Sequence, residues 1–179
     1  MATIRPAHFS GPSTDLDLCR ILMREYANFL NTSVGGQHIC VESLEEELAA
    51  LPGPYAEPAG TILLAFDDNQ TPTGCVALKP LHLDPPSSRN EKPCEMKRLW
   101  VRPTHHGTGL GRQLAYAILS AARQRGYTAM YLDTMPQSMR AAYRLYCSMG
   151  FTPVDRYTQN PVLRETGALE IAFLRKELR

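Results

Sequence analysis

The sequence predicts an α/β (α+β) fold with a central mixed sheet and helices on its faces. Three observations predict it. Two segments with apolar residues at helical spacing stand early in the chain, short apolar segments fill its middle, and helical and strand segments alternate in its second half. Such alternation packs helices against a sheet. The length of 179 residues suits one domain, which we expect to cover 1–179.

The first half is predicted to hold a short strand, two helices and a β-hairpin. Proline ends the first strand and the second helix, because it cannot donate a backbone hydrogen bond. A polar turn joins the two later strands, which favours an antiparallel pair. Residues 80–93 contain four prolines and are expected to form a loop. The expected bounds are strand Thr3–Arg5, helices Asp15–Leu30 and Glu42–Leu51, and strands Thr61–Phe66 and Gly74–Leu78.

The second half is predicted to alternate strands and helices, and a glycine ends each helix. Gly126 follows the first of these helices and Gly150 the second. The expected bounds are strand Glu95–Val101, a helix from Gly109 or Leu110 to about Arg125, strand Met130–Asp133, helix Ser138–Met149, and strands Phe151–Val154 and Glu170–Leu174.

A glycine-rich turn lies between a strand and a helix, in the segment from Trp100 to Leu114. Gly107, Gly109 and Gly111 let the backbone curl and present N–H groups to an anion. The helix behind them adds the partial positive charge of its N-terminus. This arrangement suits a pyrophosphate. No Lys-Ser or Lys-Thr pair follows, so the turn is not a Walker loop.

The segments on either side of the turn carry a family resemblance. They read EMKRLWVRP from Glu95 to Pro103 and LYCSMGF from Leu145 to Phe151. Together with the turn, they resemble the GNAT superfamily of N-acetyltransferases. In that family the turn reads Q/R-x-x-G-x-G/A after a strand ending in V-x-P, and a later helix ends in L-Y-x-x-x-G-F. The resemblance is specific over residues 94–154. It implies a mostly antiparallel, twisted sheet that splays between its two central strands, with acetyl-CoA as cosubstrate.

The resemblance also implies which residues contact acetyl-CoA. Leu99 and Val101 match the strand whose backbone bonds the acyl carbonyl and the pantetheine arm, and residues 106–111 match the pyrophosphate turn. The full predicted set is Leu99, Trp100, Val101, His106, Gly107, Thr108, Gly109, Leu110, Gly111, Arg112, Ser138 and Tyr143.

Some positions depart from the family pattern. His106 stands where Gln or Arg is usual, so the backbone amides of the turn are expected to carry the binding. Met139 stands where many relatives have an Asn that meets the pantetheine, and Ser138 is at most a substitute for it. Arg112 is either a phosphate contact or an exposed helix arginine.

Acetyl transfer from a thioester to an amine needs a stabilised oxyanion and a proton for the departing thiolate. Backbone N–H groups suit the first task, and we expect the Val101 N–H to serve. A phenol suits the second, because its pKa near 10 keeps it protonated at neutral pH. Tyr146 matches the family tyrosine that commonly acts as this acid. The alternative is a core tyrosine, with Tyr143 one helical turn earlier on the same face.

The amine must also lose a proton, and Glu95 is the predicted base. It begins the strand expected to contact the cofactor, and it matches a position where some relatives carry a catalytic glutamate. Regular strand alternation predicts that Glu95 shares a face with Leu99 and Val101. The alternative is an ion pair with Lys97 or Arg98. Positioning alone can supply much of the rate in such a reaction.

Composition excludes several other classes of function. The net charge is +1, with 19 basic and 18 acidic residues, which argues against a nucleic acid or an anionic membrane as partner. The five cysteines form no C-x-x-C pair and the histidines are dispersed, so no metal site is expected. Reduced thiols, no secretory signal and no apolar run of membrane-spanning length predict a cytoplasmic, intracellular and reducing location. His105 and His106 are phosphate contacts or an exposed loop pair.

The acceptor is less defined than the donor. The resemblance implies that it lies among three segments, Tyr26 to Gln37, Leu81 to Cys94, and Tyr157 to Glu170. A small or amino-acid-like amine is the first expectation, and a peptide or protein amine is the second. A catalytically inactive acyl-CoA sensor is the alternative from a different class. Exposed sheet edges are compatible with a homodimer.

Overall fold

The structure, a computed structural model, describes residues 2–10, 14–33, 41–83, 90–157 and 171–178. The predicted order of helices and strands is confirmed. The strands are β1 (Thr3–Pro6), β2 (Thr61–Phe66), β3 (Pro72–Pro80), β4 (Pro93–Val101), β5 (Ala129–Thr134), β6 (Thr152–Val154) and β7 (Ala172–Glu177). The helices are α1 (Leu16–Ser33), α2 (Val41–Ala49), α3 (Leu110–Gln124) and α4 (Arg140–Ser148), with short 3-10 turns at Gly53–Tyr55 and Pro103–His105.

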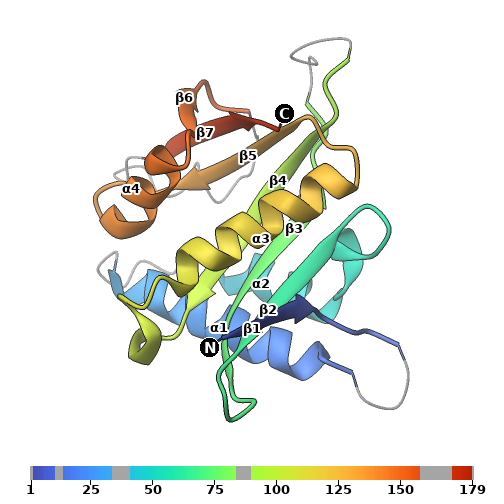
Figure 1. Ribbon diagram of the computed structural model, residues 1–179, viewed down its shortest axis with the longest axis vertical. Coiled ribbons are helices and arrows are strands. Elements are labelled where there is room, and N and C mark those ends of the chain that lie inside the picture. The colour runs from blue at the N-terminus through green and yellow to red at the C-terminus, as the bar shows by residue number, and fades with distance from the viewer. Residues whose placement is uncertain (1, 11–13, 34–40, 84–89, 158–170, 179) are drawn as a thin grey trace.

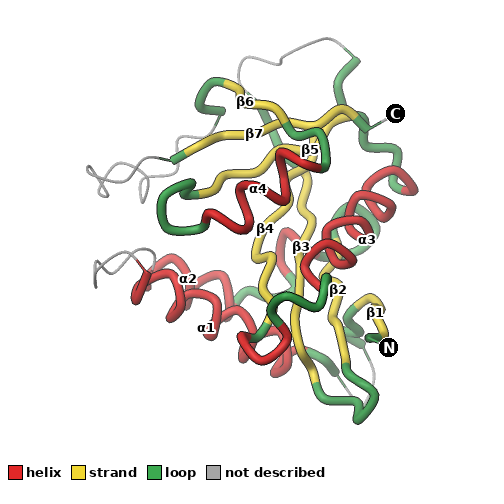
Figure 2. The backbone as a smooth tube through the Cα atoms, turned by 60° about the vertical axis from the view of Figure 1, so that its left-hand side comes forward, coloured by secondary structure: helices red, strands yellow, loops and turns green. Residues whose placement is uncertain are grey.

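The seven strands form one sheet in the order β1-β2-β3-β4-β5-β7-β6, with helices on both faces. Figure 1 shows α3 lying across the front of the sheet and α1 behind it, and Figure 2 shows α3 on the opposite side from α1 and α2. Tyr146 of α4 is buried in the same core as α3. Two hydrophobic cores follow from this layering. Leu114, Ile118 and Leu119 of α3 are buried in the first core, which is called the α3 core below. Leu22 and Met23 of α1 are buried in the second. The predicted mixed sheet flanked by helices is confirmed.

The sheet splays between β4 and β5, its only parallel pair among the described strands. Their pairing runs from Pro93 opposite Ala129 to Glu95 opposite Tyr131 and stops there, although β4 continues to Val101. Figure 1 shows the two strands meeting near the C-terminus and diverging from it. The splay expected from the family resemblance is therefore present.

A β-bulge interrupts β4. Trp100 lies opposite Cys75 of β3 and Lys97 lies opposite Ala77, so β4 holds one extra residue between them. Arg98 has φ of 56°, in the left-handed region that few residues other than glycine adopt. The extra residue reverses the alternation of side chains along the rest of the strand.

The bulge corrects one prediction about Glu95. Cys94 and Met96 face the α3 core, and beyond the bulge Leu99 and Val101 pack against that same core. Glu95, which alternates with its neighbours, therefore faces the other side of the sheet. The prediction that Glu95 shares a face with Leu99 and Val101 was wrong, because it assumed an uninterrupted strand.

Most element bounds differ from the predicted ones by one to three residues, and two of these differences concern the last third of the chain. The helix expected from Ser138 begins at Arg140, because the preceding residues form a turn closed by the Met139 N–H and the Met135 carbonyl at 2.7 Å. The last strand is Ala172–Glu177, later than expected, and Glu170 lies outside the described residues.

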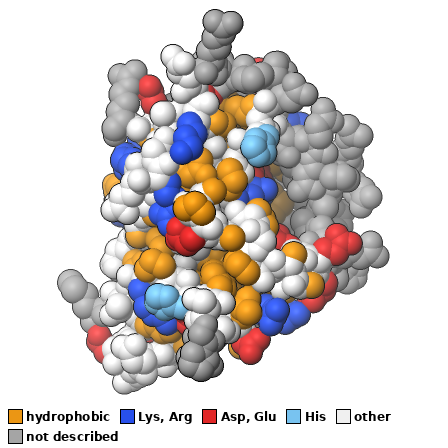
Figure 3. Space-filling view, turned by 90° about the vertical axis from the view of Figure 1, so that its right-hand side faces the viewer, with side chains coloured by type: hydrophobic (Ala, Val, Ile, Leu, Met, Phe, Trp, Pro, Cys, Tyr) orange, Lys and Arg blue, Asp and Glu red, His pale blue; other side chains and the backbone are white. Residues whose placement is uncertain are grey.

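The surface carries charges of both signs. Figure 3 shows one face on which basic and acidic side chains are interspersed with hydrophobic ones. No helix in the described part of the chain is long and apolar enough to cross a bilayer. The described residues also contain no group of three or more His, Cys, Asp or Glu side chains that could hold a metal ion.

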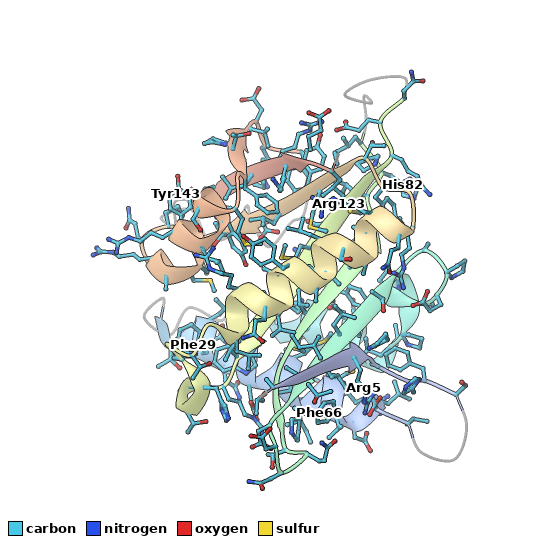
Figure 4. All side chains as sticks on the ribbon, viewed as in Figure 1. Arg5, Phe29, Phe66, His82, Arg123 and Tyr143 are labelled. Atoms are coloured by element: carbon cyan, nitrogen blue, oxygen red, sulfur yellow. The ribbon has the colours of Figure 1, made fainter. Side chains whose placement is uncertain are left out.

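At the opposite end from the splay, Arg5 lies over the Phe66 ring at 4.6 Å (Figure 4).

Candidate active site

The glycine turn borders open space. Gly107 and Gly109 have φ of 77° and 85°, so both positions require glycine for their backbone conformation. A Cβ atom built at either position would meet nothing within 4 Å. At Gly111 the φ is not positive, and a Cβ atom would be 3.8 Å from Val101 Cγ2, an ordinary contact. The turn therefore leaves room for a ligand directly over its backbone.

Helix α3 presents unpaired amides to this space. Its first hydrogen bond joins the Gln113 N–H to the Gly109 carbonyl at 3.1 Å. The N–H groups of Leu110, Gly111 and Arg112 consequently have no partner within the helix, and the N-cap residue offers no side-chain bond. The Leu110 side chain is buried in the α3 core, so only its backbone can contact a ligand. These amides and the helix dipole suit a phosphate or pyrophosphate.

The polar side chains of the turn brace its shape. His106 Nε2 lies 2.7 Å from the Val101 carbonyl oxygen, and the Thr108 hydroxyl donates to the His105 carbonyl at 2.8 Å. His105 Nδ1 lies 3.0 Å from the hydroxyl of its neighbour Thr104. These bonds join the turn to the end of β4. In this conformation the two histidines contact the loop itself.

Arg112 is exposed and reaches from α3 to α4, where its Nη2 donates to the Ser148 hydroxyl at 3.2 Å. Ser138 and Tyr143 are both half-buried. Ser138 lies in the turn before α4, whereas Tyr143 packs from α4 against the α3 core. Figure 4 shows Tyr143 on α4 and Phe29 on α1 toward the side on which β4 and β5 separate.

The end of β4 directs an amide into the splay. The Arg102 N–H bonds to the Thr73 carbonyl of β3 at 2.9 Å. Successive amides of an antiparallel ladder point to opposite sides, so the Val101 N–H points away from β3. On that side β5 has already diverged, and its pairing with β4 ended at Glu95. The Val101 amide is thus placed where a ligand between the strands can accept its hydrogen bond.

The Trp100 side chain lies on the face of the sheet that carries α1. Its ring belongs to the core under α1, 5.2 Å from the Phe29 ring and 6.1 Å from the Tyr26 ring. Its Nε1 donates to Glu25 Oε2 at 3.3 Å. Because this side chain faces away from α3, only the Trp100 backbone borders the splay.

Tyr146 lies in α4 on the α3 side of the sheet, with its ring 5.8 Å from that of Phe151. Burial raises the pKa of Tyr146, and the nearby Tyr26 and Asp133 raise it further. The phenol is therefore protonated at neutral pH.

Glu95 is buried and lies within a network of charges on the face opposite α3. Its carboxylate is 3.0 Å from Lys79 Nζ and 3.6 Å from Lys97 Nζ, and it accepts the Tyr157 hydroxyl at 2.9 Å. The ion pair with Lys97, which the sequence offered as the alternative, is therefore present, and the role of Glu95 as base stays a prediction. Arg98 pairs elsewhere, with Glu47 of α2 at 2.5 Å.

Asp133 was missed by the sequence reasoning. It lies near the end of β5, 2.7 Å from Lys97 Nζ. Burial alone would raise the pKa of Asp133, but Lys97 outweighs it and holds that pKa below its usual value. Burial would lower the pKa of Lys97, but Asp133 and Glu95 hold it above its usual value. A charged residue following Met130-Tyr131-Leu132 in a buried strand was the signal available in the sequence.

The expected acceptor segments are described only in part. Tyr157 packs edge-on against Tyr131 at 5.0 Å and Phe173 at 5.4 Å, beside Glu95. Residues 34–40, 84–89 and 158–170 lie outside the described residues, and with them His38, Cys40 and Asn160.

Known proteins share both the sequence and the fold. A profile of the Acetyltransferase (GNAT) family matches residues 18–151. An uncharacterized N-acetyltransferase of Schizosaccharomyces pombe is 36% identical over 148 residues, which cover 83% of each chain. Another uncharacterized N-acetyltransferase, of Dictyostelium discoideum, is 24% identical over an alignment that covers 92% of this chain and 95% of that one.

Solved structures agree on the fold. A GNAT acetyltransferase of Staphylococcus aureus superposes with a TM-score of 0.72 at 16% identity, over 100% of both chains. A putative acetyltransferase of Salmonella typhimurium, solved with its cofactor acetyl-CoA, gives a TM-score of 0.63 at 22% identity, over 100% of this chain and 95% of that one. With the extent of the profile match and the identity to the Schizosaccharomyces protein, these findings show that the chain belongs to the GNAT family of acetyltransferases.

Proposed function

We propose that this protein transfers the acetyl group of acetyl-CoA to the primary amine of a small or amino-acid-like acceptor, by direct attack on the thioester. The observation that carries the proposal is the convergence of two backbone features on one opening. The free amides of α3 begin at Leu110, and the Val101 amide points into the splay between β4 and β5. The first feature suits the pyrophosphate and the second suits the acyl end of the same molecule.

Acetyl-CoA supplies the acetyl group as an activated thioester. The amides of residues 110–112 hold its pyrophosphate, and the space above Gly107 and Gly109 admits it. The Val101 N–H donates to the negative charge that develops on the thioester oxygen. Tyr146, protonated at neutral pH, gives a proton to the departing sulfur.

The acceptor amine approaches from the face that carries Glu95. The bulge supports this assignment, because it puts Glu95 and the side chains of Leu99 and Val101 on opposite faces of the sheet. Donor and acceptor then meet through the splay. Glu95 removes the amine proton, directly or through a water, while Lys79 and Lys97 hold its carboxylate in place.

The test is thiol release from acetyl-CoA over a panel of small amines, amino acids and peptides. Release with a small amine and none with peptides agrees with the proposal. Thiol release with peptides alone would identify a peptide or protein as the acceptor in place of a small amine. Binding of acetyl-CoA without release for any amine identifies a sensor, and absence of binding overturns the assignment altogether.

A cytoplasmic location is also part of the proposal. Cys19, Cys75 and Cys94 are buried free thiols, and Cys147 is an exposed free thiol. Exposed free thiols are typical of a reducing compartment. Imaging of a tagged full-length chain tests the location.

The proposed homodimer is tested by light scattering of the purified protein. The edge strands β1 and β6 are short and each contains a proline, so we expect any dimer to use another surface.

A further inference from the structure

One buried hydroxyl has no hydrogen-bond partner. Thr134, the last residue of β5, is 5% exposed, and its Oγ1 bonds to nothing among the described residues. The other such atom in the described chain is Arg125 Nε, whose guanidinium already binds the Ala121 carbonyl and Glu57. A hydroxyl buried without a partner is destabilising, and most buried polar groups avoid it. Thr134 therefore needs an explanation that Arg125 does not.

The position of Thr134 supplies one. Met130 and Leu132 face the α3 core, so alternation along β5 turns Thr134 to that same face. Asp133 contacts Lys97, so the end of β5 lies beside the part of β4 where the bulge begins. This is where the two strands have stopped pairing. The hydroxyl consequently borders the splay on the side of α3.

Groups with a proposed role in catalysis lie around the same opening. Leu99 and Val101 pack toward α3 from the opposite strand. Tyr146 of α4 is buried in the same core as these two side chains, and the Asp133 carboxylate of β5 helps to raise its pKa. A ligand that lies between β4 and β5 must pass between these groups and Thr134.

We propose that Thr134 Oγ1 donates a hydrogen bond to a carbonyl oxygen at the acylated end of acetyl-CoA. This inference rests on the proposed function. The carbonyl belongs to the thioester or to an amide of the pantetheine arm, and both accept a hydroxyl proton in the same way. Without ligand the hydroxyl has no partner among the described residues, and the cosubstrate satisfies it.

The test compares Thr134→Val, which removes the hydroxyl and keeps the branched shape, with Thr134→Ser, which keeps the hydroxyl. Dissociation constants are measured by calorimetry for acetyl-CoA, CoA and adenosine 3′,5′-bisphosphate, which lacks the pantetheine arm. Thr134→Val is expected to weaken acetyl-CoA binding about tenfold, as loss of one buried hydrogen bond does. Its affinity for the nucleotide fragment stays that of the wild type, and Thr134→Ser stays close to wild type for all three ligands.

The melting temperature separates this role from a structural one. Without ligand, Thr134→Val is expected to melt at or above the wild-type temperature, because no hydrogen bond of the unliganded protein is lost. Tyr127→Phe is the control. The Tyr127 side chain is also buried, but its hydroxyl donates to the Ala59 carbonyl at 2.8 Å, so its loss should lower the melting temperature and leave acetyl-CoA affinity unchanged.

The outcomes are distinct. Weaker binding of acetyl-CoA alone identifies the thioester carbonyl as acceptor, and equally weaker binding of CoA identifies an amide carbonyl. An unchanged affinity of Thr134→Val for acetyl-CoA overturns the inference. An equal loss of affinity for the nucleotide fragment also overturns it. Failure of the wild-type protein to bind acetyl-CoA overturns the proposed function instead.

Discussion

At the scale of single residues, the hydroxyl of Tyr146 is the proposed proton donor to the departing sulfur. Tyr146→Phe removes the proton and keeps the buried ring against Phe151. We expect turnover to fall about 10²-fold or more, with the dissociation constant of acetyl-CoA nearly unchanged. Steady-state kinetics and calorimetry measure the two quantities. Tyr127→Phe is the control, because the Tyr127 hydroxyl donates to the Ala59 carbonyl at 2.8 Å, at the other end of β5. Wild-type turnover in Tyr146→Phe would make Tyr146 a core residue.

The direction of the Tyr146 pKa shift adds a pH dependence. An acid catalyst works while it is protonated, and burial raises the pKa of this phenol above its ordinary value. Deprotonation of Tyr146 should therefore lower turnover only above about pH 10, which is the ordinary pKa of a phenol. A pH–rate profile that loses activity through a Tyr146 titration below this value would contradict the assignment.

Glu95 is tested by an uncharged variant of the same shape. In Glu95→Gln the side chain cannot accept the amine proton, so turnover should fall while acetyl-CoA affinity remains. Asp15→Asn is the matched control. Asp15 is also a buried carboxylate, bound to Arg5 at 2.7 Å, but it has no proposed part in the reaction. If both variants lose turnover and melting temperature to the same degree, Glu95 is a structural ion-pair partner rather than the base.

At the scale of elements, the glycine turn and α3 form one binding feature. Gly109→Trp puts an indole into the open space over the turn, so we expect a sharp rise in the dissociation constant of acetyl-CoA. Gly126→Trp is the control at the other end of α3. Gly126 has φ of 73°, similar to the 85° of Gly109, so both variants carry comparable backbone strain. Equal acetyl-CoA affinity in the two variants would remove the pyrophosphate from this turn.

The bulge of β4 contacts α2 through Arg98. The Arg98 guanidinium binds the Glu47 carboxylate through Nε at 3.2 Å and Nη2 at 2.5 Å, and the Tyr55 hydroxyl donates to Glu47 at 2.6 Å. Glu47→Gln leaves the guanidinium largely buried without its counter-charge. We expect a loss of about 2–3 kcal/mol in the free energy of unfolding. Acetyl-CoA affinity should fall as well, because the bulge sets the direction of Leu99 and Val101.

Glu45→Gln is the control for this prediction, with the same substitution in the same helix. Glu45 pairs with Arg24 at 2.8 Å, but both side chains are about half exposed. Exposed ion pairs contribute little to stability. Chemical denaturation of both variants measures the difference. A loss in Glu45→Gln as large as in Glu47→Gln would contradict the role of burial.

Sequence patterns predicted the elements well and the site less completely, for a physical reason. Apolar spacing, prolines and glycines are local signals, and they were sufficient for the order of strands and helices. The bulge is not a local property, since the residue that holds Arg98 is 51 positions away in α2. The faces of Glu95 and Trp100 follow from the bulge, and the ion pair of Asp133 with Lys97 joins two strands. None of these features can be predicted from a short segment of the sequence, because each depends on contacts between segments that are far apart in the chain.

At the scale of the whole molecule, four acidic side chains make stability depend on pH. Asp15, Glu25, Glu47 and Asp133 all have pKa values below their usual ones, because arginine or lysine partners stabilise their charged forms. A carboxylate with a lowered folded-state pKa stabilises the fold above its unfolded pKa of about 4, and that contribution disappears as pH falls through the folded value. The melting temperature should therefore be constant near neutrality and fall below about pH 4. A fall that is complete above pH 5 would point to other groups.

The splay divides the molecule into two parts that acetyl-CoA is expected to join. β1 to β4 with α1 and α2 lie on one side of it, and β5 to β7 with α4 lie on the other. Only the first part of β4 pairs with β5, so a ligand between their diverging ends supplies contacts that the sheet lacks. At a hundredfold excess over its dissociation constant, binding should add about 2.7 kcal/mol and raise the melting temperature by roughly 5–10 °C. Hydrogen exchange then locates the effect, with new protection expected at the amides of Val101 and of residues 110–112. Protection confined to the turn, with none at Val101, would show that the ligand binds at α3 without entering the splay.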